Sequence, residues 1–140
     1  MRRWSMKRRK KKTERQELIG QLDDIFRQII RLRDNSICQK SGLRNNIEVA
    51  HYHSRKHLRL RWELDNSCCL NGGIHRYWAH VESEDFRDFW IKRIGQERFN
   101  ELKLKKQYNA PVRTADLKLL KLDLLDKLEY YKRKFLSIRI

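Results

Sequence analysis

All five histidines of the chain lie between residues 51 and 80: His51, His53, His57, His75 and His80. Histidine can transfer protons near neutral pH, and its ring nitrogens bind divalent metals. On a β-strand, His51 and His53 would point to the same face, because side chains repeat every two residues. On a helix, His75 and His80 would be turned apart by about 140°. We therefore expect one of these two, rather than both, to bind a metal ion.

The same segment holds the parts of a site that could hydrolyse a phosphodiester bond. Such a site needs a base to activate water, a metal ion to stabilise charge on the phosphate, and fixed donors to hold the phosphate. A histidine on a strand, an asparagine in the following loop and a histidine at the start of a helix can supply these parts. The sequence contains them in the order His51, Asn66, His75.

Hydrophobic periodicity predicts the elements that must position these residues. Apolar residues recur every three or four positions over 16–33, which predicts a helix closed by turn residues at 34–36. Alternation over 47–53 predicts a strand, and 54–65 is expected to be a long loop or irregular hairpin arm. Further helices are predicted from about 74, over 84–94, over 96–105 and over 115–137.

The last predicted helix carries a heptad-like apolar stripe, made of Leu117, Leu120, Leu124, Leu128, Tyr131 and Phe135. A stripe of this kind can pack on its own domain or pair with a second copy of the chain. We favour packing on the domain, and a homodimer through this helix is the alternative.

Charge predicts the class of partner. Lysine and arginine outnumber aspartate and glutamate by 34 to 18, which leaves a formal net charge of +16. A surface this basic favours a polyanion, with DNA first because phosphates neutralise such a surface and release counterions. No apolar stretch approaches the roughly 20 residues needed to span a bilayer, and no signal peptide is evident. We therefore expect a cytoplasmic protein with no membrane partner.

Residues 1–15 form a basic arm with one acidic residue, Glu14. Like charges at this density resist packing, so we expect the arm to be disordered when free. Its lysines, among them Lys10, Lys11 and Lys12, are candidates for phosphate contact without sequence preference. The alternative is a tail that aids solubility or a segment that resembles a nuclear-localisation signal.

The three cysteines, Cys38, Cys68 and Cys69, do not form a disulfide framework, because their number is odd and two of them are adjacent. In a reducing compartment, metal binding or plain burial is the expected role.

Several linked segments resemble one family. Residues 49–55 (VAHYHSR), 61–66 (RWELDN) and 71–75 (NGGIH) resemble the HNH, or ββα-metal, endonucleases. The likeness is nearest to the phage NinG-type recombination endonucleases, and it continues into 91–102 (IKRIGQERFNEL). It covers residues 37–104, about half of the chain.

The resemblance implies roles for individual residues. His51 is similar to the general base, and Asn66 to the asparagine that orients the loop or touches the metal. His75 matches the metal ligand on the helix, with Mg²⁺ or Mn²⁺, or else Zn²⁺ or Ni²⁺, as the cofactor. Arg55 and Arg61 are similar to arginines that hold phosphate, and Arg59 in the same basic segment is a further candidate for nucleic-acid contact.

Two departures from the family pattern affect its metals. Many relatives hold a structural zinc with two Cys-x-x-Cys pairs, of which this chain retains only Cys38 in 38–41 and neither cysteine in 71–74. We therefore expect no structural zinc, although a shifted site at Cys68 and Cys69 is an alternative. Ala50 replaces an acid or histidine that binds the catalytic metal in many relatives, and His53 is the available substitute.

These observations predict an α+β fold in which a small ββα-metal (HNH) core is flanked by helices. The expected organisation is a basic arm at 1–15, a helix at 16–36, an HNH-like nuclease domain at 37–105 and a helix at 112–140. The expected function is a metal-dependent DNA endonuclease in phage recombination or processing. The alternatives are an inactive nucleic-acid-binding protein on the same scaffold and a basic component of a ribonucleoprotein or virion.

Overall fold

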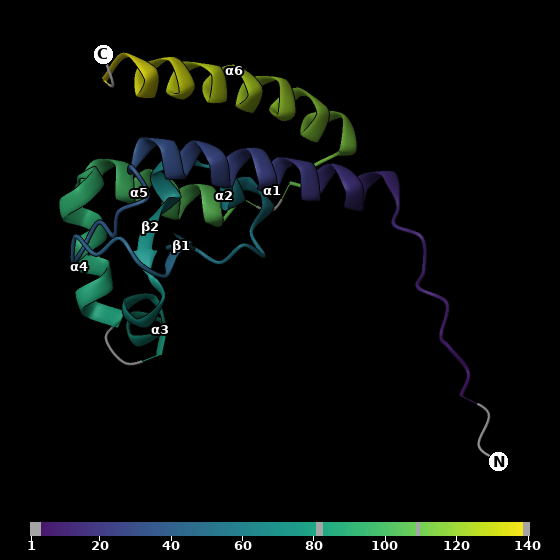
Figure 1. Cartoon of the computed structure of the whole chain (residues 1–140), viewed down its shortest axis with the longest axis horizontal. Helices are drawn as coiled ribbons and strands as arrows, with labels where there is room; N and C mark the ends of the chain where they lie inside the picture. Colours follow the sequence, from purple (N-terminus) through teal and green to yellow (C-terminus); the bar gives the residue numbers. More distant parts are fainter. Residues whose placement is uncertain (1–3, 81–82, 109, 139–140) are drawn as a thin grey trace.

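A computed structural model of the chain describes residues 4–80, 83–108 and 110–138. Figure 1 shows its elements, which are in chain order α1 (Glu14–Arg33), β1 (Ile47–His51), α2 (Leu58–Arg61), the 3-10 turn η1 (Leu64–Asn66), β2 (Ser67–Asn71), α3 (Gly72–His80), α4 (Ser83–Ile94), α5 (Gln96–Lys106) and α6 (Thr114–Ile138). These helices and the two-stranded antiparallel sheet confirm the predicted α+β class.

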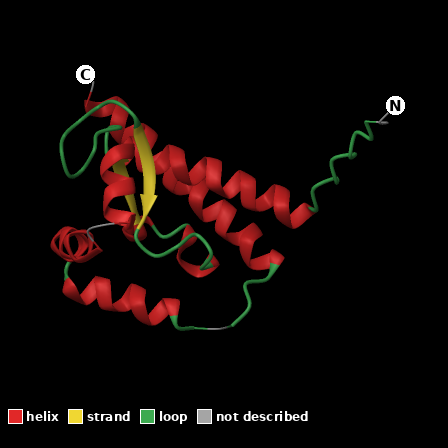
Figure 2. Ribbon diagram, turned by 90° about the horizontal axis from the view of Figure 1, so that it is seen from below, coloured by secondary structure: helices red, strands yellow, loops and turns green. Residues whose placement is uncertain are grey.

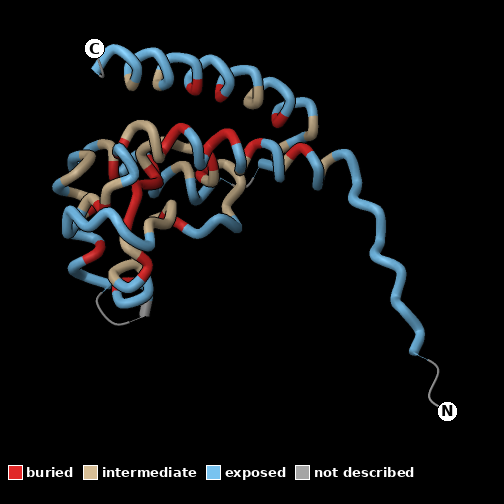
Figure 3. The backbone as a smooth tube through the Cα atoms, viewed as in Figure 1, coloured by how far each residue is buried: buried red, intermediate tan, exposed pale blue. Residues whose placement is uncertain are grey.

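Helix α1 begins inside the predicted basic arm. The Thr13 side chain accepts a hydrogen bond from the Gln16 backbone N–H, and the Gln16 side chain accepts one from the Thr13 N–H. This reciprocal pair satisfies two backbone donors that a helix start leaves open, so the helix begins at Glu14 and not at 16. Arg15 is anchored to the Val112 carbonyl and the Thr114 hydroxyl. The exposed segment without helix or strand therefore spans 4–13 (Figure 3).

The sheet pairs β1 with β2 over their whole length, from Ile47 opposite Asn71 to His51 opposite Ser67. The chain bends directly after His51, so the strand predicted over 47–53 ends two residues early. The segment predicted as a long loop contains α2 and η1 before it returns to β2 (Figure 2). The chain therefore runs strand, loop, strand and helix from β1 to α3.

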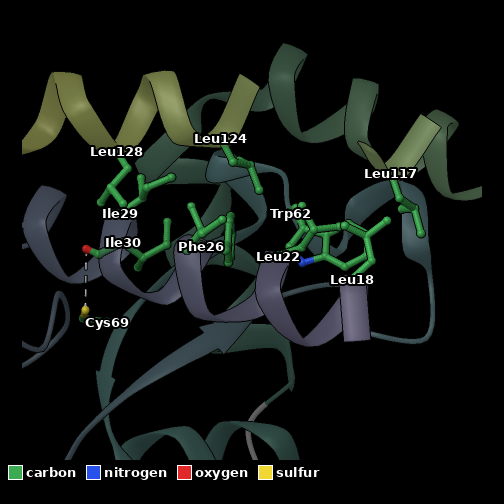
Figure 4. Close-up of a cluster of buried hydrophobic side chains, with 11 residues drawn as sticks. Leu18, Leu22, Phe26, Ile29, Ile30, Trp62, Cys69, Leu117, Leu124 and Leu128 are labelled. Carbon is green, nitrogen blue, oxygen red and sulfur yellow. Dashed lines mark hydrogen bonds between the residues drawn. The ribbon is translucent and has the colours of Figure 1, made fainter. Parts of the chain in front are cut away.

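One hydrophobic cluster joins α1 and α6 to one face of the sheet. Its buried members are Leu18, Leu22, Ile25, Phe26, Ile29, Ile30, Trp62, Cys69, Leu117, Leu124 and Leu128 (Figure 4). The α6 stripe is thus covered by α1, with Leu120 and Tyr131 partly buried against the same cluster. The predicted packing on the domain is confirmed for these residues of the stripe, and a homodimer through this helix stays a prediction.

A second cluster covers the other face of the sheet with α3, α4 and α5. Its buried members are Cys38, Ala50, Cys68, Leu70, Trp78, Phe86, Trp90 and Phe99. Strand alternation sends Cys68 and Cys69 to opposite clusters. The sheet is therefore held between two layers of helices, which fixes the position of the strand end that carries His51.

A buried carboxylate ties these layers together. Asp34, directly after α1, accepts hydrogen bonds from the Arg33 and Arg93 guanidinium groups and from the Cys69 backbone N–H. Arg33 also donates to the carbonyls of Leu64 and Ser67. One charge network thus connects α1, β2 and α4.

Candidate functional site

A pocket of about 710 Å³ opens where β1, the following loop, α3, α4 and α5 meet. His51, His53, His57 and His75 all contribute to its lining. The structure therefore brings together four of the five histidines singled out in the sequence. The side chain of His80, the remaining candidate ligand, lies outside the described part of the structure.

Aromatic rings and cations complete the pocket. Tyr52, Trp78, Phe86 and Phe99 supply apolar lining from the second cluster. Arg87 of α4 and Asn100, Lys103 and Lys106 of α5 contribute polar and basic groups. Among the described lining residues there is no carboxylate, so the pocket favours an anionic ligand.

No motif in the sequence assigned the α4 and α5 residues to this site. Lys103 and Lys106 lie four and seven residues after Phe99, so the sequence places the three side chains on one face of a helix. This spacing does not indicate that the face lies against the histidines.

His51 is arranged to accept a proton. Its Nε2 atom lies 2.9 Å from the Arg61 carbonyl oxygen, and its ring stacks on Phe26 with the ring centroids 5.7 Å apart. A carbonyl only accepts hydrogen bonds, so Nε2 carries the proton and Nδ1 of the neutral ring holds the lone pair. Burial, reinforced by the charge of Arg55, lowers the pKa of His51 to about 4. The ring is therefore neutral at neutral pH, as a base must be.

His75 is arranged to bind a cation. Its Nδ1 atom lies 2.9 Å from a carboxylate oxygen of Glu48 on β1. Because the carboxylate accepts from Nδ1–H, the lone pair of the neutral ring is on Nε2. Pairing of a histidine with a carboxylate is the usual arrangement behind a metal-binding imidazole. A Cβ atom on Gly72 would lie 2.8 Å from both Asn46 Nδ2 and Glu48 Oε1, so a larger residue at the start of α3 would require these side chains to shift.

His53 presents an unused buried nitrogen. The residue is 8% exposed, and its Nε2 atom has no hydrogen-bond partner among the described residues. Burial and the charges of Lys106 and Lys103 lower the pKa of His53 to about 4. Its ring packs against Tyr52 and Phe99, whereas the His51 ring packs on Phe26. The expectation that the two rings share one strand face fails because the strand ends at His51.

Asn66 holds the loop that carries His53. Its side-chain oxygen accepts from the His53 backbone N–H at 2.9 Å, and its amide nitrogen donates to the carbonyls of His53 and Leu60, both at 3.1 Å. The residue is fully buried. Two roles were expected for Asn66, orienting the loop or touching the metal. This geometry matches the first, because both polar atoms of the side chain form hydrogen bonds with the backbone.

Two of the predicted phosphate-binding arginines bind a carboxylate of the same chain. Arg61 donates to both oxygens of Asp23 on α1, at 2.9 and 2.6 Å, and Arg55 donates to one of them. Burial alone would raise the pKa of Asp23, but hydrogen bonds from Arg61 and Trp62 lower it below its usual value. A phosphate role for Arg55 and Arg61 stays a prediction, and it would require competition with Asp23.

The cysteines are buried and separate from the histidine pocket. Burial raises the pKa of Cys68 to about 12 and that of Cys69 to about 11, so both thiols are protonated near neutral pH. Within residues 4–80, 83–108 and 110–138, no three His, Cys, Asp or Glu side chains converge as a ligand set. Imidazole nitrogens suit Zn²⁺ and Ni²⁺, whereas Mg²⁺ prefers oxygen ligands and takes several of them from substrate phosphates and water. The open nitrogens of His75 and His53 are therefore better suited to Zn²⁺ or Ni²⁺ than to Mg²⁺.

The two depressed histidine pKa values predict an acid-sensitive fold. An unfolded chain protonates these histidines below about pH 6.5, whereas the folded protein resists protonation down to about pH 4. Stability is therefore present above pH 6.5 and is lost as the pH falls toward 4, by up to about 2 kcal/mol for each histidine at pH 4.5. Urea unfolding in EDTA at pH 7 and 4.5 would measure this. The double variant His51→Gln/His53→Gln should lose most of the difference, and an unchanged difference would contradict the prediction.

The comparisons with known proteins place the chain in no family. Neither protein-family models, nor curated proteins, nor solved structures gave a match to this chain. In the described ranges, no helix has both the length and the apolar character needed to cross a membrane.

Proposed function

We propose that this protein is a metal-dependent DNA endonuclease of the HNH type, which hydrolyses phosphodiester bonds. The observation that carries the proposal is the convergence of His51, His53, His57 and His75 on one pocket rimmed by Arg87, Lys103 and Lys106. The order β1, loop, β2 and α3 agrees with the ββα arrangement that the resemblance implies.

Each group has a task in this reaction. His51 Nδ1 removes a proton from water, whose oxygen attacks phosphorus while the bond from phosphorus to the leaving oxygen breaks. The rim cations hold the phosphate and balance its charge. His75, oriented by Glu48, and His53 would hold a divalent ion, which stabilises negative charge on the phosphate and the leaving oxygen.

The resemblance also supplies the biological setting of the proposal. The phage NinG-type endonucleases that the sequence resembles process DNA during recombination, so we assign this protein to phage DNA recombination or processing in the host cytoplasm. The net charge of +16 supports a DNA substrate through phosphate contacts, with the basic segment that includes Lys10, Lys11 and Lys12 extending the contact area.

Metal dependence is the direct test of the proposed function. We expect plasmid nicking with Mg²⁺, Mn²⁺, Zn²⁺ or Ni²⁺ and none in EDTA. Replacing Glu48 by Gln should lower the rate or metal affinity about 10- to 100-fold, because the carboxylate orients His75. Glu129→Gln, which makes the same change at an exposed position of α6, is the matched control and should retain activity. Undiminished nicking in EDTA, or a fully active Glu48→Gln variant, would contradict the assignment of the metal to this pair.

A second candidate is a catalytically inactive nucleic-acid-binding protein on the same scaffold. Ala50 is fully buried and offers no ligand, and the described pocket lining has no carboxylate. This candidate predicts steeply salt-dependent DNA binding with no cleavage in any of the four metals.

A further inference from the structure

A second, smaller pocket of about 220 Å³ adjoins the histidine pocket. The two pockets share His57 and Lys106 in their linings. The smaller one extends past the start of α2 and the end of α5, where Lys56, Arg59 and Tyr108 line it. The two pockets therefore meet at these residues, and together they are called the track.

Most cations of this track have no acidic partner among the described residues. These are Lys56, Arg59, Arg87, Lys103 and Lys106, and no carboxylate lines either pocket in the described part of the chain. Lys105, which also lines the smaller pocket, pairs with Glu63, and Arg55 and Arg61 beside the track pair with Asp23. The fold thus leaves five of the six lysine and arginine residues of the track without a counter-charge.

An aromatic platform lies at the far end of the track. The Arg59 guanidinium sits 4.9 Å from the centroid of the Tyr108 ring, and it donates to the Ala110 carbonyl at 3.2 and 2.9 Å. These bonds hold the guanidinium against the ring. Tyr108 is 65% exposed, so the ring remains accessible to a ligand. Rings of this kind beside cations stack unpaired bases of nucleic acids.

We infer that the track binds a single-stranded segment of nucleic acid, with an unpaired base on Tyr108. This inference rests on the proposed function, which places the phosphate to be cleaved at the histidines. Lys56, Arg59 and Lys106 then contact neighbouring phosphates of the same strand. A continuous duplex does not fit this arrangement, because its bases are stacked on one another and present no free face to Tyr108.

Binding measured without catalysis tests the track. The probe is a fluorescently labelled single-stranded DNA of about twelve nucleotides, titrated in EDTA with the full chain, beside the matched duplex. Tyr108→Ala should weaken single-strand binding about 5- to 100-fold, equivalent to the stacking of one base, and leave duplex binding unchanged. Tyr108→Phe keeps the ring and should bind as the original protein does. Equal losses for both DNAs, or no loss for either, would overturn the inference.

The cations are tested by the salt dependence of the same binding. The double variant Lys56→Gln/Arg59→Gln should lower the slope of log affinity against log salt by about 1.4, at about 0.7 for each single-strand phosphate contact. Lys132→Gln/Lys134→Gln, which removes two exposed charges from α6, is the control for net charge and should change the slope less. Equal slopes for the two double variants would overturn the phosphate contacts.

These outcomes separate the inference from the proposed function. Absence of cleavage in every metal, together with single-strand binding that depends on Tyr108, would refute the nuclease and support the track. Metal-dependent cleavage with Tyr108→Ala binding unchanged would support the nuclease and refute the track.

Discussion

Replacing His51 with glutamine is expected to slow DNA cleavage about 100- to 10,000-fold, the usual contribution of a general base. Nδ1 of His51 is the lone-pair nitrogen, because Nε2 donates to the Arg61 carbonyl 2.9 Å away. Glutamine can still donate a hydrogen bond to that carbonyl, but its amide cannot take a proton from water. Single-turnover cleavage of a labelled duplex with an unpaired branch, at saturating protein, would measure the effect.

Stability and binding serve as controls for the His51 variant. The variant should unfold at a similar temperature and bind DNA in EDTA with similar affinity, since the change removes a base and not a charge at neutral pH. Cleavage at the original rate by a folded His51→Gln protein would remove His51 from the role of base. Because the pKa of His51 is about 4, cleavage should also lose this base only below about pH 5.

Replacing Asp34 with asparagine is expected to lower the free energy of unfolding by about 3–5 kcal/mol, the usual cost of removing one partner of a buried ion pair. Asp34 is 6% exposed and compensates two arginines, Arg33 and Arg93, while its second oxygen accepts the Cys69 N–H. The neutral amide leaves these half-buried guanidinium groups without their counter-charge. Urea unfolding at pH 7 would measure the loss.

Asp24 offers a matched control for Asp34. Its side chain is 68% exposed and pairs only with Arg27, one helical turn away on α1. Exposed pairs contribute about 1 kcal/mol or less, so Asp24→Asn should leave the free energy of unfolding nearly unchanged. Similar stabilities for the two variants would show that the Asp34 network does not stabilise the packing of α1, β2 and α4.

Both predictions concern residues whose roles the sequence revealed to different degrees. His51 was visible from its type, its strand and its neighbours, because strand alternation is a local pattern. Asp34 appeared only as a turn residue after a helix. Its partner Arg93 lies 59 positions away, and no local pattern links two residues at that separation.

The basic residues also show which properties follow from the sequence and which depend on the tertiary structure. Composition alone predicts a polyanion partner, but it cannot tell a free cation from a neutralised one. Arg55 and Arg61 lie in the same short basic segment as Lys56 and Arg59. Asp23 of α1 nevertheless pairs with Arg55 and Arg61 only, among these four described residues. Which cations remain for phosphate therefore depends on how α1 packs, and the α5 cations enter the site by the same long-range packing.

The sequence by itself determined the longer helices, the α+β class and the histidine-rich segment, since each follows from residue periodicity or local composition. It also indicated that the α6 stripe is apolar enough to be buried. Only the tertiary structure decided that β1 ends at His51, that Asn66 holds the His53 loop, and that Glu48 orients His75. These depend on contacts between residues far apart in the chain, where hydrogen-bond geometry and burial, and not periodicity, select one arrangement.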